Sequence, residues 1–199
     1  VSKLNPEIPV EIRETDHLFF RLDLLQDDLE THAASRRSTW KPNVRAMTQN
    51  WLNMGLRPRA VTRDIEWGVK IPLDDEVWGE KRVYVWFDAV QGYLTCARIW
   101  SERIAEESGS ESDIWRRWWM DSGNLRHIYF MGKDNIPFHT IIWPGILMAL
   151  NRGREDPERL HLEDNVASNE YLMLSGDQFS TSRKHAVWLP TFLERYDPD

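Results

Sequence analysis

The feature that most constrains the fold is a pair of short, unbroken apolar and aromatic runs, each followed by a helical pattern. The runs are Val83–Phe87 and His127–Met131, and their length and composition suit strands that are buried on both faces. The helical spacing after the first run is carried by Tyr93, Leu94, Ala97, Trp100 and Ile104. An order of strand, helices, strand and helix is typical of a parallel sheet, so we predict an α/β fold.

Two further helices belong to this pattern. One is predicted over Asp113–Met120, and another from about Asn135, where Pro144 should kink or shorten it because proline lacks a backbone N–H. The end of the chain is predicted to form a strand, a turn and the start of a helix, at Asn169–Leu174, Ser175–Asp177 and Thr191–Arg195.

The part of the chain before the first run is predicted to be mainly helical. Leu22, Leu25 and Leu29 recur at helical spacing, and so does a second set made of Trp40, Val44, Met47, Trp51 and Met54. Pro42 near the start of the second set and Gly55 near its end are the residues that helix ends favour.

Composition limits the class of protein. The 199 residues hold 41% hydrophobic residues, which excludes a wholly disordered chain. The single cysteine, Cys96, excludes an internal disulfide and a cysteine-rich zinc site. The longest apolar run, Ile141–Leu150, is about half as long as a bilayer requires. We therefore expect an intracellular, cytoplasmic protein; Val1–Pro6 hold no export signal, and the missing initiator Met suggests a piece of a longer chain.

Charge changes sign along the first third of the chain. Residues 1–35 are mainly acidic and residues 36–71 mainly basic, although the whole chain carries a net charge of -7. The basic stretch either faces phosphates or forms a solvated face that pairs with the acidic segment before it. The overall acidity disfavours non-specific nucleic-acid binding as the main function.

The carboxyl ends of parallel strands open on one edge of the sheet, where ligands bind. This geometry favours the loops at residues 88–93 and 132–135 as parts of a site. Gly132 lets the backbone approach a ligand and the Asp134 carboxylate can accept ribose hydroxyls, unless Asp134 only caps the helix. His139, on the same helix, is a ligand contact or a hydrogen-bonded core histidine.

Other candidates are aromatic or hydroxyl-bearing. Trp86, Tyr93 and Trp143 either form an aromatic box for an apolar or thioether group or belong to the core. Residues 180–185 offer hydroxyls, amides and cations, and so form a phosphate cradle or a solvated linker. Neither the G-x-x-x-x-G-K-[ST] loop nor the G-x-G-x-x-G fingerprint is present.

Taken in order, these segments resemble the second half of the catalytic region of methionyl-tRNA synthetase, a class I aminoacyl-tRNA synthetase, in its archaeal-like branch. The resemblance covers nearly the whole chain. It rests on Trp40–Arg45, Thr62–Val69, Val83–Ala89, Phe130–Pro144, Asn169–Leu172 and Phe179–Arg183. It implies an α/β fold in which the second half of a Rossmann-like parallel sheet, at residues 82–174, follows the later part of a mainly helical connective insertion, at residues 1–81. Residues 175–199 would hold a KMSKS-like loop and the start of a stem-contact segment.

The resemblance also implies roles for single residues. The methionine pocket would be lined by Trp86, Ala89, Val90, Tyr93, Asn135 and His139, with His139 near the thioether. The ATP site would use Gly132, Asp134 and Gln178, with Gly132 and Asp134 on the ribose. The KMSKS-like loop that closes over the ATP phosphates would supply Ser180, Thr181, Ser182 and Arg183 for catalysis.

The chain is thus expected to be a fragment of a methionine-tRNA ligase, whose substrates would be methionine, ATP with Mg²⁺, and tRNA. The HIGH-type motif of the family and its zinc-binding cysteines are absent from this sequence, so we expect the isolated fragment to be inactive and to hold no zinc site. Gln178 and Thr181 replace the two lysines of the KMSKS consensus. This departure keeps open an alternative, a non-catalytic synthetase-like binding or regulatory module.

Overall fold

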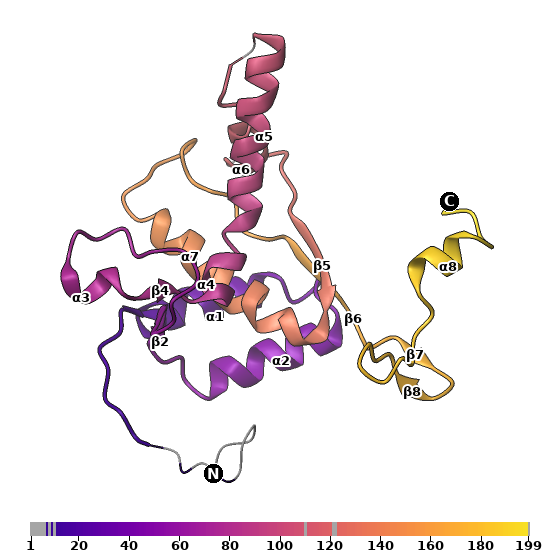
Figure 1. The fold of residues 1–199 in the computed structure, drawn as a ribbon. Helices are drawn as coiled ribbons and strands as arrows, with labels where there is room; N and C mark the ends of the chain where they lie inside the picture. Colours follow the sequence, from indigo (N-terminus) through magenta and orange to yellow (C-terminus); the bar gives the residue numbers. More distant parts are fainter. Residues whose placement is uncertain (1–6, 8, 10, 110, 121–122, 199) are drawn as a thin grey trace.

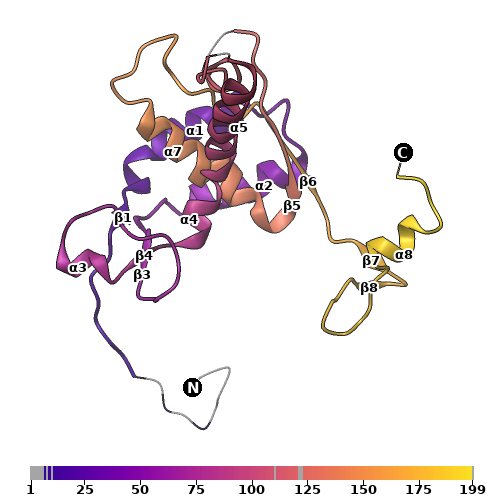
Figure 2. The same cartoon turned by 45° about the horizontal axis from the view of Figure 1, so that its top comes forward.

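The structure, a computed structural model of the chain, describes residues 7, 9, 11–109, 111–120 and 123–198. Val1–Pro6, where the sequence shows no export signal, lie outside the described residues. Helices α1, α2 and α7 gather beside a parallel strand pair, β5 and β6, while the long helix α5 and the β7–β8 hairpin with α8 project from this body (Figures 1 and 2). None of the described helices combines the length and the apolarity that a membrane span requires.

The two helices predicted before Gly55 are confirmed. The first begins as a 3-10 turn, η1 (Leu22–Leu25), and continues as α1 (Gln26–Ser35). The second, α2 (Pro42–Asn53), starts with a proline, whose missing N–H costs nothing in the first turn of a helix. Gly55 follows α2 with a φ of 74°, a left-handed conformation that favours glycine.

The main core lies between these N-terminal helices and α7 (Trp143–Leu150). Leu22, Leu25 and Leu29 are buried on one side, and they pack in the same cluster as Trp143 and Leu147. Gly145 allows the two sides to approach, because a Cβ there would lie 3.1 Å from Cδ1 of Leu22. The apolar spacing seen in the sequence therefore marks the buried face correctly.

The parallel pair joins β5 (Ile128–Gly132) to β6 (Asn165–Asn169), in a register that runs from Ile128 opposite Asn165 to Gly132 opposite Asn169. The connection between them contains the 3-10 turn η2 (Lys133–Asn135), the π-helical segment η3 (Phe138–Ile142) and α7. This strand, helix and strand unit confirms the α/β class and the strand that was predicted at residues 127–131.

The prediction of a strand over Val83–Phe87 is wrong. Only Arg82–Val83 (β4) is extended, and it pairs antiparallel with Thr62–Arg63 (β3), not with β5. Residues Val85–Ala89 form a short helix, α4, in which the amide groups of Phe87 and Asp88 both donate to the Tyr84 carbonyl. A five-residue apolar run fits either state, and here the helix lets its aromatic side chains reach partners on other elements.

The interruption predicted at Pro144 is present just before it. In the π-helical segment η3 the Trp143 amide donates to the Phe138 carbonyl, five residues back, and α7 then begins with Pro144 in its first turn. The proline therefore starts a helix instead of breaking one, and the wider turn upstream accommodates the change.

The remaining elements are short, apart from α5 (Gly92–Ser108), which follows α4 and ends at Gly109. The helix predicted over Asp113–Met120 is reduced to α6 (Arg116–Trp119), and the strand predicted over Asn169–Leu174 is divided between the end of β6 and β7 (Met173–Leu174). The predicted turn is the tip of the β7–β8 hairpin. The other elements are β1 (Phe19–Phe20), β2 (Arg59–Ala60), α3 (Glu76–Gly79), β8 (Asp177–Gln178) and α8 (Leu189–Leu193), which starts two residues earlier than predicted.

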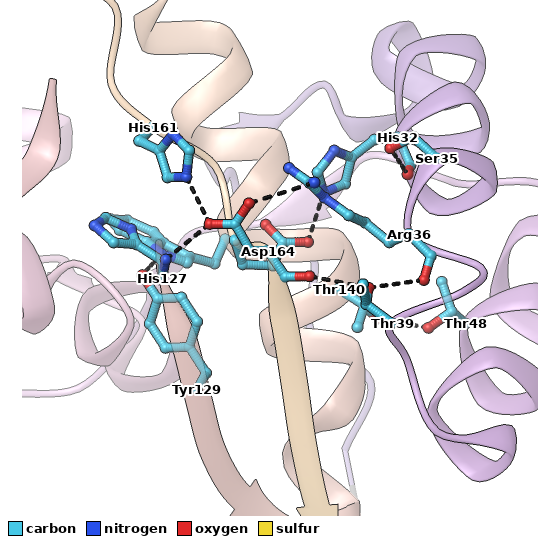
Figure 3. A network of polar contacts seen from close by, with 12 residues as sticks. His32, Ser35, Arg36, Thr39, Thr48, His127, Tyr129, Thr140, His161 and Asp164 are labelled. Carbon is cyan, nitrogen blue, oxygen red and sulfur yellow. Dashed lines mark hydrogen bonds and ion pairs between the residues drawn. The ribbon is translucent and has the colours of Figure 1, made fainter. Parts of the chain in front are cut away.

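A polar network fastens α1 to the strand pair (Figure 3). Asp164, just before β6, lies between His161, whose Nε2 is 2.6 Å from its carboxylate, and Arg36, whose guanidinium is 3.4 Å away. The same carboxylate accepts a hydrogen bond from the backbone amide of His127. Arg36 therefore pairs with Asp164. This acid lies outside the acidic segment 1–35, which was the pairing partner considered for the basic stretch.

Candidate active site

A cavity of about 170 Å³ lies between the α4–α5 segment and the η2–η3 segment. Its lining comprises Trp86, Ala89, Val90, Tyr93, Asn135, Phe138 and His139. The structure thus brings together all six residues that were assigned to one pocket from the sequence. The cavity is below the size of drug-sized pockets, roughly 300–1,000 Å³, and suits a small ligand such as an amino-acid side chain.

One wall of the cavity is helical. Trp86, Ala89, Val90 and Tyr93 are spaced at i, i+3, i+4 and i+7, and this spacing places them on one face of the continuous α4–α5 segment. Gln91 bridges the junction, since its amide donates to the Asp88 carbonyl and its carbonyl accepts from Thr95. The wall therefore comes from a helix face and not from a loop at the end of a strand.

The opposite wall comes from the segment after β5. Asn135 and His139 are one helical turn apart, and the Nδ1 atom of His139 lies 2.9 Å from the Asn135 carbonyl oxygen. Its Nε2 atom lies 2.8 Å from the Tyr93 hydroxyl on the facing wall. His139 is thus a buried, hydrogen-bonded histidine that also lines the cavity, so the two interpretations of this residue are not exclusive.

These contacts fix the tautomer of His139. A carbonyl oxygen only accepts, so Nδ1 carries the proton and donates to Asn135, and Nε2 accepts from the Tyr93 hydroxyl. Burial lowers the pKa of His139 below its usual 6.5, although the hydrogen bond to Asn135 offsets part of this effect. Burial also raises the pKa of Tyr93. Both groups are therefore uncharged at neutral pH, and the cavity suits an uncharged side chain.

Aromatic rings support both walls. The Trp86 ring stacks on Phe138 with centroids 5.4 Å apart, and Tyr93 packs against Tyr129 of β5 at 5.0 Å. Trp143 is buried behind Tyr93, and the centroids of their rings lie 6.4 Å apart. Its indole N–H donates to the Tyr129 hydroxyl. Trp143 thus supports the site from the core instead of lining it as the sequence interpretation allowed.

Phe138 is a lining residue that the sequence assignment omitted. It lies three residues after Asn135 and next to His139, so the helical spacing of this segment was the available signal. Its ring also covers Trp86 across the cavity.

Gly132 and Asp134 lie at the end of β5, next to the cavity wall. Open space surrounds the position where a Gly132 side chain would lie, so a ligand can approach the backbone here. Asp134 is exposed and belongs to η2, and it does not cap that turn. Its carboxylate accepts a hydrogen bond from Tyr171 instead. The capping alternative for Asp134 is therefore wrong.

The loop with Ser180, Thr181, Ser182 and Arg183 follows β8, the strand that carries Gln178, and the β7–β8 hairpin projects away from α4 and α5 (Figure 1). None of these loop residues belongs to the lining of the cavity. The backbone groups of Ser180 and His185 bond to each other at both ends of the loop, at 2.9 and 3.0 Å. The amide of Arg183 donates to the Ser180 hydroxyl, which lies 3.3 Å from the Ser182 hydroxyl. The structure therefore gathers the loop residues locally and does not bring them to the cavity.

Metal ligands do not gather in the described part of the chain. Its histidine, cysteine, aspartate and glutamate side chains include no group of three or more that could hold a metal ion.

Comparison with known proteins gives consistent matches. The family model described as tRNA synthetases class I (M) matches residues 1–199. The methionine-tRNA ligase of Roseiflexus sp. (strain RS-1) is 49% identical over an alignment of 196 residues, with coverage of 96% of this chain and 31% of that protein. The corresponding ligase of Chlorobium limicola (strain DSM 245 / NBRC 103803 / 6330) is 46% identical over 198 residues, 100% of this chain and 27% of that protein.

A solved structure agrees with these matches. Mycobacterium tuberculosis methionyl-tRNA synthetase in complex with methionyl-adenylate superimposes with a TM-score of 0.67 and 26% identity, over 96% of this chain and 33% of that one. The chain thus spans about a third or less of the length of the proteins that it matches.

Proposed function

We propose, from the premise that the chain belongs to the class I tRNA synthetase (M) family, that it is the part of a methionine-tRNA ligase that binds the methionine side chain and the ATP ribose. The full-length enzyme would join methionine to the AMP part of ATP, with release of pyrophosphate, and then transfer the methionyl group to tRNA. Residues 82–174 would hold both binding sites, residues 1–81 would belong to the connective insertion, and residues 175–199 to the KMSKS-like loop and the start of the stem-contact segment.

The observation that carries this proposal is the cavity between α4–α5 and η2–η3. Apart from Asn135 and His139, the residues that line it are aromatic or apolar. Its one histidine is neutral and hydrogen-bonded on both ring nitrogens. A thioether is uncharged, polarisable and favoured at the edges of aromatic rings, by roughly 0.3–1.5 kcal/mol per contact. A charged side chain would lose its hydration here and gain no counter-ion, so the cavity favours methionine over charged amino acids.

The position of Asp134 supports the second half of the proposal. Asp134 and Asn135 are consecutive, so their Cα atoms lie about 3.8 Å apart, and one faces solvent while the other lines the cavity. A ligand that joins an amino acid to a nucleotide needs two such neighbouring sites. Ribose hydroxyls are donors that the Asp134 carboxylate can accept beside the open backbone at Gly132.

In the proposed reaction the methionine carboxylate attacks the α-phosphate of ATP, an adenylate forms and pyrophosphate leaves. This chain would contribute mainly by holding the two reactants side by side, which replaces a bimolecular encounter. Mg²⁺ would enter as part of the ATP substrate. A movement of the hairpin would bring a set of loop residues to the phosphates, namely Gln178, Ser180, Thr181, Ser182 and Arg183. Arg183 is the cation of this set and would stabilise the phosphate charge.

The test is a comparison of Michaelis constants in the full-length ligase that contains this chain. His139→Ala removes a cavity wall and leaves the Tyr93 hydroxyl and the Asn135 carbonyl without this partner, so we expect KM for methionine to rise about tenfold, the effect of roughly 1.4 kcal/mol. KM for ATP should change less than twofold. The assay is methionine-dependent ATP–pyrophosphate exchange.

His17→Ala provides the matched control, since His17 hydrogen-bonds Thr62 at 2.9 Å, outside the cavity lining. This control should leave both constants close to wild type. Equal changes in the two constants for His139→Ala would contradict the pocket assignment.

A second candidate function, a non-catalytic binding or regulatory module, is favoured only by Gln178 and Thr181 in place of the consensus lysines. Each missing charge removes on the order of 3 kcal/mol of transition-state stabilisation if nothing replaces it. Methionine binding without any ATP–pyrophosphate exchange by the full-length protein would support this module and overturn the ligase proposal.

A further inference from the structure

Tyr171 makes a contact with Asp134 that spans 37 residues of sequence. The Tyr171 hydroxyl donates to Oδ2 of the Asp134 carboxylate, and this bond links the segment after β6 to the segment after β5. The family resemblance rests in part on Asn169–Leu172, which includes Tyr171, but it assigned this tyrosine no role. The hydrogen bond stabilises the neutral phenol and raises the pKa of Tyr171, so the hydroxyl stays a donor at neutral pH.

Neighbouring side chains fix the tyrosine itself. The ammonium group of Lys133 lies 4.5 Å from the centroid of the Tyr171 ring and 2.9 Å from the carboxylate of Glu170. A cation over the face of an aromatic ring is attracted by the ring quadrupole. Lys133 thus holds both Glu170 and Tyr171 beside the turn that carries Asp134.

This cluster is anchored to α2. The side-chain amide of Asn43 donates to Glu170 at 3.2 Å and to the Ser168 hydroxyl at 2.9 Å. The Lys41 ammonium donates to the Ser168 carbonyl. The ring of Tyr171 therefore has a defined place relative to the helical part of the body, although 43% of its surface is exposed.

We propose that Tyr171 is a positioning residue for ribose recognition, which holds the Asp134 carboxylate in the orientation that receives the ribose hydroxyls of ATP. This inference rests on the proposed function. A carboxylate has about four acceptor sites, and Tyr171 uses one of them, so capacity remains for two ribose hydroxyls. Without Tyr171, an exposed aspartate samples several rotamers, and binding must select one of them.

The decisive variant is Tyr171→Phe in the full-length ligase, which removes the hydroxyl and keeps the ring under Lys133. We expect KM for ATP to rise about fivefold, an effect of about 1 kcal/mol, which is in the range of a typical hydrogen bond because the site is exposed. KM for methionine should stay within twofold of wild type. Tyr196→Phe is the matched control, because the Tyr196 ring stacks on Phe192, and it should leave both constants unchanged.

A second substrate separates positioning from a general structural role. With 2′,3′-dideoxy-ATP, which lacks both ribose hydroxyls, Tyr171→Phe should have no effect on KM for the nucleotide. A rise that is as large with the dideoxy substrate as with ATP would overturn the inference, because the tyrosine would then act independently of the ribose. A fall in KM for ATP would also overturn it, since it would mean that Tyr171 competes with the ribose for Asp134.

Asp134→Asn distinguishes failure of this inference from failure of the proposed function. If Asp134→Asn raises KM for ATP and Tyr171→Phe does not, the ribose site stands and the role of Tyr171 is wrong. If Asp134→Asn leaves KM for ATP unchanged, the ribose assignment in the proposed function fails, and the role of Tyr171 fails with it.

Discussion

The pair formed by His32 and Glu163 gives a quantitative prediction about what holds the helical part to the strand pair. Nε2 of His32, near the C-terminal end of α1, lies 2.7 Å from Oε1 of Glu163, and these residues are 131 positions apart in the sequence. Glu163 has no exposed surface, and the His32 side chain is only 9% exposed. Oε2 of Glu163 has no hydrogen-bond partner among the described residues, so the carboxylate depends on His32.

His32→Ala leaves this carboxylate buried without its partner. Loss of one member of a buried pair costs about 3–5 kcal/mol. We expect the lower end, about 3 kcal/mol, because truncation of His32, whose side chain is 9% exposed, opens a cavity that water can enter. With a urea slope of about 2.5 kcal/mol per molar, the unfolding midpoint should fall by about 1 M. Equilibrium unfolding in urea, followed by tryptophan fluorescence, measures the shift.

Two further variants isolate the cause. Replacement of both residues, as His32→Leu with Glu163→Met, removes the buried carboxyl group together with its partner, so most of the lost stability should return. Arg21→Ala breaks an ion pair with Asp23, also in the N-terminal region, but Arg21 is 58% exposed and the midpoint should barely move. A fall for His32→Ala no larger than for Arg21→Ala would refute the reasoning.

Two other predictions concern the core and its response to acid. Burial lowers the pKa of both His127 and His139 below 6.5, so the unfolded chain binds more protons below that pH, and stability should be lost as the pH falls through 6.5. Urea midpoints should therefore be lower at about pH 5.5 than at about pH 7.5, and equal midpoints would contradict this. Leu147→Ala should cost about 3 kcal/mol, because Leu147 is fully buried in the main core. Leu150→Ala, on the exposed side of the same helix, should cost much less in the same assay.

The elements that could be predicted from the sequence are those in which the apolar spacing extends over several turns or the ends carry clear helix-boundary residues. The spacing of Leu22, Leu25 and Leu29 and the Pro42 to Gly55 boundaries identified two helices, and both are present. The run at Val83–Phe87 offered five residues, which are too few to distinguish a strand from a helix. A helical spacing was the better signal for this segment, and it is carried by Trp86, Ala89, Val90 and Tyr93. These four residues share one helical face, and this face begins inside the segment that was predicted to be a strand.

Contacts between distant segments were beyond prediction from local patterns. The pairs His32 with Glu163 and Tyr171 with Asp134 join parts of the chain that no spacing rule connects. Tyr171 carries no periodic or turn signal, and Glu163 looks like any polar residue before a strand. Only the folded register, in which β5 and β6 end together at Gly132 and Asn169, brings Tyr171 beside Asp134.

The pocket exists although the strand that was expected to build it does not, and the packing behind Tyr93 explains why. The expected arrangement used the ends of two neighbouring strands, whereas the observed cavity lies between two helical segments. The sheet still contributes, because Tyr129 of β5 packs on Tyr93 and accepts the indole N–H of Trp143. Tyr93 is thus held by Tyr129 of β5, by Trp143 of α7 and by His139. Its hydroxyl in turn hydrogen-bonds the histidine that lines the cavity. The sheet therefore supports the binding wall through aromatic packing, and the helix faces determine what the cavity accepts.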